Sequence, residues 1–165
     1  MNTHSKKYII YKIHSATTKI KHGGFCAYID LDRKTGLKMY GTKKFALDSI
    51  RAQRKLLRVK VAPKVYSGVF EVPLLNVSWK GSRIDNIYKL KAYCYITEKA
   101  HTKFDRKIYR PQIKRIRNVL ERYGLREDDI LRWNNNNPIW RNLGVVRNKL
   151  VIIDFDPCTI YGYSN

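Results

Sequence analysis

The stretch Trp133–Asp156, WNNNNPIWRNLGVVRNKLVIIDFD, contains the features that decide the fold of this chain. Two short apolar runs, Leu143–Val146 and Leu150–Ile153, flank an Arg-Asn-Lys turn, and this pattern predicts a β-hairpin. Such a hairpin holds Asn142 just before its first strand and Asp154 just after its second, so we expect the two side chains to lie side by side. Amide and carboxylate oxygens suit Mg²⁺, and the stretch therefore predicts a metal site at this end of the hairpin.

The charge of the chain is its most extreme property. The 165 residues include 34 Lys and Arg against 13 Asp and Glu, which gives a formal charge of +21. Such a balance makes polyanions natural partners: nucleic acid, an anionic membrane surface or an acidic protein. The alternative is that the positive charge only solvates the surface. The length is that of one compact unit with a core of its own.

Cysteines and histidines give no sign of a disulfide framework or a zinc site. Cys26, Cys94 and Cys158 are widely spaced, no C-x-x-C occurs, and none of the four histidines clusters with them. This usage is typical of a reducing compartment. The N-terminal residues lack the apolar region of a signal peptide, and no apolar run approaches the length of a membrane span. We therefore expect a cytoplasmic protein with no membrane partner.

The first forty residues read as strands. Residues 7–14 (KYIIYKIH) and 25–31 (FCAYIDL) have the β-branched and aromatic content of strands. The segment 32–36 (DRKTG) predicts a hairpin turn in which glycine is available for a positive φ. Residues 37–40 (LKMY) then form a third strand, antiparallel to the second.

A helix is predicted over residues 43–58 (KKFALDSIRAQRKLLR). Ala46, Ile50, Gln53 and Leu57 recur at helical spacing and form its buried stripe. Gln53 is the polar member of this stripe, so it either finds a buried hydrogen-bond partner or lies at the edge of the stripe.

Further β structure is predicted after this helix. A β segment starts at 62–66 and continues through 68–72, and 88–97 (YKLKAYCYIT) alternates as a strand with one buried side, formed by Tyr88, Leu90, Ala92, Cys94 and Ile96.

A second helix is predicted from Pro111, a favourable first-turn residue, to a stop at Gly124. Its apolar arc consists of Ile113, Ile116, Val119, Leu120 and Tyr123. The opposite face is cationic. Such a charge run is usually a solvated face, but the scarcity of acids within it makes an anionic partner the alternative. The candidate polyanion-binding residues are Lys107, Arg110, Lys114, Arg115, Arg117 and Arg122.

The order of motifs resembles the catalytic region of protein kinases, in which D-x-x-x-x-N is followed by two short strands and D-F-G. The two metal-ligand positions match Asn142 and Asp154. The catalytic-base position holds Asn137 in place of Asp, and the last position of the second motif holds Asp156 in place of Gly. The resemblance implies ATP and Mg²⁺ as ligands. Only nine residues follow Asp156, so it also implies that the substrate-binding half of a kinase is missing.

The N-terminal half extends this resemblance. By its place in the kinase order, Lys38 corresponds to the strand lysine that holds the nucleotide phosphates, and Gly23 and Gly24 to the glycine-rich loop. Gln53 replaces the helix glutamate and is expected to hydrogen-bond Lys38. The stretches GLKMY, KKFALDSIRAQRKLL and APKVY look like small kinase-like proteins of tailed bacteriophages, which implies a host cytoplasm.

The expected fold is therefore α+β and protein-kinase-like, in a single unit. Residues 1–98 form an N-terminal antiparallel sheet with one helix. Residues 99–165 form a truncated C-terminal lobe of helix, catalytic-like loop and β-hairpin.

Three functions fit the sequence. The first is a catalytically degenerate kinase-like protein that binds nucleic acid or an acidic host protein. The second is a minimal ATP-dependent phosphotransferase that uses Lys38, Asn142 and Asp154. The third is a basic nucleic-acid-binding domain unrelated to kinases, in which tyrosines and tryptophans stack on bases.

Overall fold

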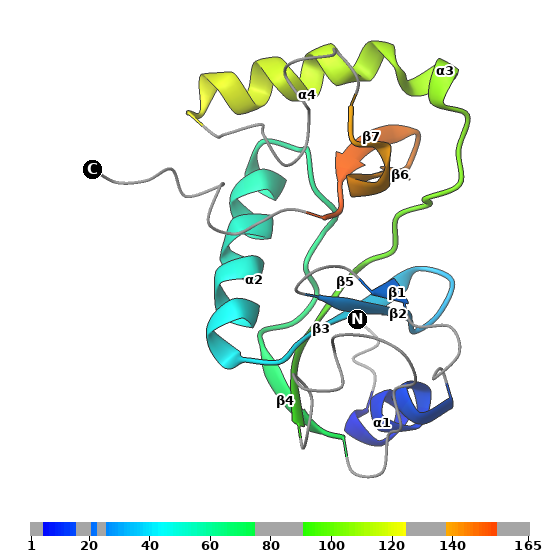
Figure 1. The fold of residues 1–165 in the computed structure, drawn as a ribbon, viewed down its shortest axis with the longest axis vertical. Helices are drawn as coiled ribbons and strands as arrows, with labels where there is room; N and C mark the ends of the chain where they lie inside the picture. Colours follow the sequence, from blue (N-terminus) through cyan, green and yellow to red (C-terminus); the bar gives the residue numbers. More distant parts are fainter. Residues whose placement is uncertain (1–4, 16–20, 23–25, 75–90, 125–137, 155–165) are drawn as a thin grey trace. The chain divides into compact units, whose positions relative to one another are not determined.

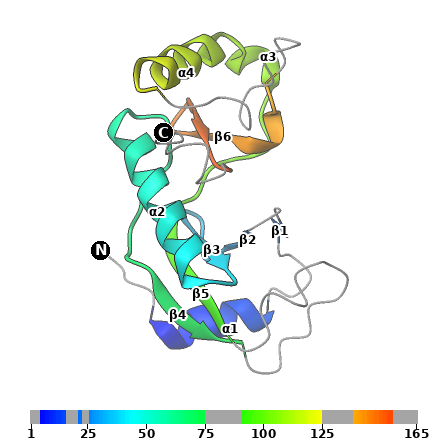
Figure 2. The ribbon, with the colours of Figure 1, turned by 60° about the vertical axis from the view of Figure 1, so that its left-hand side comes forward.

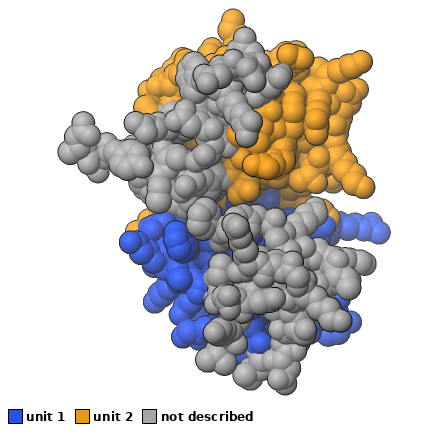
Figure 3. All heavy atoms as spheres, in the orientation of Figure 1, with its two compact units in different colours: residues 1–50, 65–98 blue, residues 51–64, 99–165 orange. Residues whose placement is uncertain are grey.

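The structure, a computed structural model, describes residues 5–15, 21–22, 26–74, 91–124 and 138–154. It divides into two compact units, one of residues 1–50 and 65–98 and the other of residues 51–64 and 99–165 (Figure 3). Helices and antiparallel strands occur in separate stretches, and the architecture is α+β, as predicted.

The first unit is built on a five-stranded antiparallel sheet in the order β1-β2-β3-β5-β4 (Figure 1). Its strands are β1 (Lys21–His22), β2 (Ala27–Asp30), β3 (Thr35–Tyr40), β4 (Phe70–Pro73) and β5 (Lys91–Glu98). Strands 25–31 and 37–40 of the sequence prediction correspond to β2 and β3. The β segment predicted from residue 62 is shorter than expected, because only Val65 forms a bridge before β4 begins.

The prediction of a strand at residues 7–14 is wrong, because these residues form helix α1 (Lys6–Ser15). Ser5 caps its start, since its hydroxyl accepts a hydrogen bond from the Tyr8 amide at 3.2 Å. Ile9 and Ile13 lie one turn apart and are both buried. Their helical spacing outweighs the β-branched composition once they pack in the same apolar core as Leu37 and Met39 of the sheet.

Strand β5 is buried on both faces in its second half, whereas one buried side was predicted. Ala92, Cys94 and Ile96 are buried as expected, but Tyr95 and Thr97 on the opposite face are buried too. The second face is covered because Tyr40 and Tyr95 pack in one cluster with Ala46 and Ile50 of helix α2 (Lys43–Arg58).

The turn between β2 and β3 is stabilised by Asp32. Its carboxylate accepts hydrogen bonds from the amides of Lys34 at 2.6 Å and Thr35 at 2.7 Å. Gly36 does not have the positive φ that the sequence suggested. A Cβ there would overlap the ring of Tyr28, so this position requires glycine for close packing.

Helix α2 has the predicted bounds and is capped by the hydroxyl of Thr42, which accepts from the Phe45 amide at 3.2 Å. The predicted stripe is right for Ala46, Ile50 and Gln53. Leu56 is fully buried in place of Leu57. The early part of the helix therefore contributes to the core of the first unit and its last turns to the core of the second.

Lys60 ends α2 in a left-handed conformation, with φ of 61°. The Lys60 amide donates to Leu57 O at 2.9 Å and the Val61 amide to Leu56 O at 3.1 Å. This pair of bonds is a Schellman motif, in which glycine is the usual residue at the position that Lys60 occupies.

The second unit combines helices α3 (Arg106–Tyr109) and α4 (Pro111–Arg122) with the strands β6 (Leu143–Val146) and β7 (Lys149–Ile152) (Figure 2). Gly124 follows α4 with φ of 61°, as its predicted role requires. The core includes Leu56, Ile113, Ile116, Leu120, Leu143, Leu150 and Ile152. Tyr123 was predicted in the apolar arc of α4, but it is 54% exposed because it follows the last helical turn.

Candidate functional site

The predicted β-hairpin is present, with strands that pair Leu143 with Ile152 and Val146 with Lys149. Arg147 and Asn148 form a two-residue turn with φ of 49° and 61°. Two consecutive left-handed residues are the signature of a type I′ turn, whose twist matches that of the strands. The turn is therefore one residue shorter than the Arg-Asn-Lys turn of the prediction, and Lys149 begins the second strand.

Asn142 and Asp154 lie at the open end of this hairpin. The backbone carbonyl of Asn142 accepts hydrogen bonds from the amides of Ile153 at 2.9 Å and Asp154 at 3.3 Å. These bonds continue the strand pairing by one step beyond Leu143, so Ile153 lies opposite Asn142 and Asp154 follows one residue later. The Asp154 side chain is exposed and that of Asn142 is half-buried. An amide and a carboxylate at this place fit a magnesium ion that keeps several of its waters.

The short turn before β6 is a 3₁₀ helix, η3 (Trp140–Asn142), anchored by aromatic contacts. The rings of Trp140 and Phe104 pack edge to face with their centres 6.0 Å apart. The guanidinium of Arg106 lies 5.8 Å from the centre of the Trp140 ring. These contacts fix the residue two positions before Asn142, and so restrain the backbone that presents its amide.

Strand β6 has its outer edge covered by the segment that precedes α3. His101 and Val145 exchange two backbone hydrogen bonds of 2.9 Å each. A two-stranded hairpin is only marginally stable by itself, and its edges need partners when they are buried.

Strand β7 has its outer edge covered by side chains of α4. Gln112 accepts from the Leu150 amide at 2.8 Å and donates to Asn148 O at 3.2 Å. Arg115 donates to Leu150 O at 2.8 Å, and Val61 O accepts from the Ile152 amide at 2.8 Å. The backbone of β7 is thus bound by side chains where a third strand would otherwise be needed.

Gln53 is fully buried, and its amide nitrogen donates to Pro63 O at 3.0 Å. The sequence left open whether Gln53 finds a buried hydrogen-bond partner or lies at the edge of the stripe, and the first alternative is right. Its amide oxygen is the atom that could accept from Lys38, and the bond between these two residues remains a prediction.

Lys38 lies in the middle of β3, paired with Tyr28 on one side and Tyr95 on the other. It is 8% exposed, although lysine is among the residues least often buried. Burial of a lysine is favourable only where polar groups compensate for the lost hydration of its ammonium.

A buried hydroxyl cluster lies on the face of the sheet that carries Lys38. Ser49 of α2 is 2.5 Å from the hydroxyl of Tyr40 and 3.0 Å from that of Tyr95, and burial raises the pKa of Tyr40 well above its ordinary value. The cluster binds α2 to the sheet within the first unit. It escaped prediction because Ser49 precedes Gln53 by one turn and reads as an ordinary polar helix residue.

Three predicted site residues, Gly23, Gly24 and Asn137, lie outside the described residues. Asp156 also lies outside them. Among the site residues that the structure describes, Lys38 belongs to the first unit and Gln53, Asn142 and Asp154 to the second.

The six predicted polyanion-binding residues fall into two groups. Lys107, Arg110, Lys114 and Arg122 are exposed, whereas Arg115 and Arg117 are half-buried. In addition to its bond to Leu150, Arg115 donates to Lys60 O at 3.3 Å, and partial burial lowers the pKa of its guanidinium. Arg115 was predicted only as a polyanion-binding residue, and these contacts also assign it a structural role.

No family model, curated protein or solved structure matches this chain in comparisons with known proteins. Within the described ranges, no helix is long and apolar enough to cross a membrane.

Proposed function

We propose that this chain is a catalytically degenerate protein-kinase-like protein that binds a nucleotide with Mg²⁺ and acts by binding a polyanionic partner. The observation that carries the proposal is the hydrogen bonding of Asn142 O to Ile153 and Asp154, which brings an amide and a carboxylate to the same end of the hairpin. This pair is the oxygen-donor set that the kinase resemblance requires for its metal.

Two further residues support the nucleotide part of the proposal. Lys38 is a nearly buried cation on a central strand, and Gln53 is a fully buried amide on α2. When bound, the metal neutralises charge on the nucleotide phosphates. The ammonium of Lys38 is suited to contact the α- and β-phosphates, and Asn142 and Asp154 to hold the metal.

Weak catalysis follows from two substitutions in the kinase pattern. Asn137 stands where a carboxylate would accept the proton of the attacking hydroxyl, and an amide is a very poor proton acceptor. Gln53 can orient Lys38 only through a hydrogen bond from the ammonium to a neutral amide oxygen, which is weaker than an ion pair. We therefore expect nucleotide binding without efficient phosphoryl transfer.

The experiment compares nucleotide binding by the wild type, Lys38→Met and Asp154→Asn, with and without Mg²⁺. We expect Asp154→Asn to lose the Mg²⁺-dependent part of the affinity, and Lys38→Met to weaken binding by about tenfold in either condition, or about 1.4 kcal/mol. The matched control is Glu121→Gln, which removes an exposed acid from α4. Equal affinity in all four proteins contradicts the nucleotide site.

A minimal phosphotransferase is the second candidate, favoured by the same retained pair of oxygen ligands and by buried Lys38. Labelled phosphate transfer from ATP that disappears in Asp154→Ala would establish it. A basic nucleic-acid-binding domain unrelated to kinases would bind nucleic acid but show no Mg²⁺-dependent nucleotide affinity.

A further inference from the structure

Positive charge is concentrated in the second unit. Its described residues contain 18 Lys and Arg against three Asp and Glu, whereas the described residues of the first unit contain ten against five. A surface with so few acids attracts polyanions strongly and over a distance set by the salt concentration. The binding surface for such a partner is therefore best sought in the second unit.

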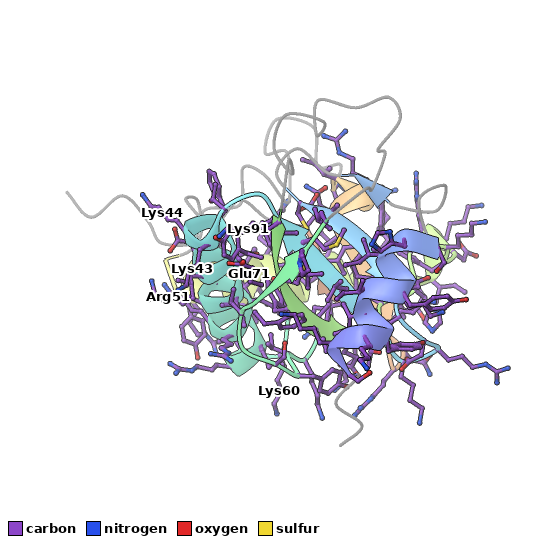
Figure 4. The ribbon with its side chains drawn as sticks, turned by 90° about the horizontal axis from the view of Figure 1, so that it is seen from below. Lys43, Lys44, Arg51, Lys60, Glu71 and Lys91 are labelled. Atoms are coloured by element: carbon purple, nitrogen blue, oxygen red, sulfur yellow. The ribbon has the colours of Figure 1, made fainter. Side chains whose placement is uncertain are left out.

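Arg115 joins the end of α2 to the side of α4 within this unit. Its guanidinium donates to Lys60 O, the carbonyl of the left-handed residue that ends α2. Val59 and Val119, one from each side of this contact, pack against the same core. The side chains of Arg58 and Lys60 are both exposed, and Figure 4 marks the position of Lys60.

The cations of α4 continue from the same contact. Arg122 follows Arg115 by seven residues, which is two helical turns along one stripe and roughly 10 Å along the axis. Lys114 is the immediate neighbour of Arg115 and is exposed. Because Arg115 is bonded to Lys60 O, the end of α2 that carries exposed Lys60 lies beside the helix that carries exposed Arg122, 62 residues later in the sequence.

We propose that Arg58, Lys60, Lys114 and Arg122 form one binding surface, the junction surface, for the phosphate backbone of a nucleic acid. Arg115 is not a ligand in this surface but a positioning residue, since it holds α4 against the end of α2. The proposal deepens the polyanion-binding part of the proposed function and is independent of its nucleotide-binding part.

Two observations favour a nucleic acid over an acidic protein. Val59 and Val119 at the junction are half-buried and pack against the core, so only part of their surface is open to form the apolar centre that a stable protein interface needs. Tyr123 directly follows Arg122 and is 54% exposed, so the end of α4 offers solvent an aromatic ring of the kind that stacks bases.

The test is a salt titration of binding to a short duplex DNA and a single-stranded DNA of the same sequence. The junction variant carries Arg58→Gln, Lys60→Gln, Lys114→Gln and Arg122→Gln. Its matched control carries Lys6→Gln, Lys7→Gln, Arg33→Gln and Lys34→Gln, which remove four exposed cations from the first unit. Glutamine preserves the backbone bonds of Lys60, and the thermal midpoint of each protein verifies that it is folded.

We expect the junction variant to bind at least about tenfold more weakly at low salt, and to lower the slope of log K against log salt by about three. The control should retain the wild-type slope. Equal losses in both variants would overturn the proposal, because net charge alone would then explain binding. Absence of nucleic-acid binding by the wild type near 50 mM salt would also overturn it.

Polyglutamate, used as a competitor, distinguishes the two partner classes. The proposal is supported if polyglutamate displaces DNA only at a concentration of negative charges much higher than that of competing DNA. Displacement at the same concentration of negative charges would indicate an acidic protein as the partner and would overturn the proposal. Mg²⁺-dependent nucleotide binding should be unchanged in the junction variant. If the junction surface does not bind DNA, the proposed nucleotide binding is unaffected. If nucleotide binding is absent, the proposed DNA binding by the junction surface is unaffected.

Discussion

The two units use polar side chains in opposite ways. In the first unit, Lys38, Ser49 and the hydroxyls of Tyr40 and Tyr95 are buried on one face of the sheet, while the other face is an apolar core. In the second unit, Gln112 and Arg115 reach from α4 to the backbone of the hairpin. The first unit therefore encloses its polar groups, and the second uses them to complete a sheet that is too small to satisfy its own edges.

Surface charge follows the same division. An ion pair of 3.2 Å joins Lys91 and Glu71 across β5 and β4 in the first unit (Figure 4). The second unit has three described acids for 18 described cations, so its described residues carry a much larger excess of positive charge. Side chain–backbone bonds such as those of Gln112 and Arg115 do not require an acidic partner, so they are compatible with this excess of charge.

Loss of a core side chain from the hairpin should give the largest effect. Leu150→Ala removes a fully buried side chain from β7, and we expect the free energy of unfolding to fall by about 2–5 kcal/mol. Hydrogen exchange measured segment by segment should show the loss of protection mainly in α4, β6 and β7. An equal loss of protection in β3 and β5 would contradict the expectation that the substitution acts mainly on the second unit.

The Arg115 contacts can be tested separately from its charge. Arg115→Met leaves Lys60 O and Leu150 O without this donor and should cost about 1–3 kcal/mol. Arg115→Lys keeps the charge but not the planar fork that reaches two carbonyls, so it should recover only part of the loss. Denaturant unfolding measures both, with exposed Arg122→Met as the matched control. Full recovery by lysine would show that charge alone matters.

Alkaline pH should weaken the first unit through its buried tyrosines. Burial raises the pKa of Tyr40 above its ordinary value near 10, so this hydroxyl keeps its proton in the folded state while the unfolded chain ionises. Its contribution is complete below pH 10 and falls by about 1.4 kcal/mol per pH unit above it. In Tyr40→Phe, stability should fall less steeply with pH above pH 10 than in the wild type. Thermal midpoints measured from about pH 9 to about pH 11 test this expectation. An unchanged pH dependence would exclude Tyr40 as a cause.

The smallest expected effect concerns the residue that ends α2. Lys60→Gly removes the steric cost of a left-handed lysine but gives the unfolded chain more freedom, so stability should rise by about 0.5 kcal/mol or less. The same change removes one cation of the junction surface, and it should lower the salt slope of DNA binding by about 0.7–0.9. A gain in stability together with weaker binding would separate the two roles of this residue.

Local patterns predicted the elements whose neighbours in sequence are also their neighbours in space. Helix α2, helix α4 and the β6–β7 hairpin each follow from periodicity, caps and turn residues within about 16 residues. The prediction for residues 7–14 failed because a strand-like composition and a helical spacing of two isoleucines occur together there. Only packing against the sheet decides between strand and helix.

Long-range contacts account for what the sequence could not predict. Arg115 reads as one more solvent-facing cation, because its acceptors lie 55 and 35 residues away. Gln112 has the same property, with its partner at Leu150. The presence of Asn142 and Asp154 at the same end of the hairpin was predictable, since the hairpin is local, whereas contact between their side chains stays a prediction. Leu56 and Leu57 are adjacent, and only the direction of the core distinguishes them.

The type I′ turn at Arg147 and Asn148 has a consequence for the order of folding. Strands that pair at sequence separations of three to nine residues form within about 1–10 μs. The partners of the outer edge of β7, Val61 O and the side chains of α4, precede the residues that they bond by 35 residues or more. During synthesis, Ile113, Ile116 and Leu120 therefore emerge before the strands that cover them. The growing chain exposes this apolar face of α4 until the hairpin is made, and that interval is when the second unit is most vulnerable to aggregation.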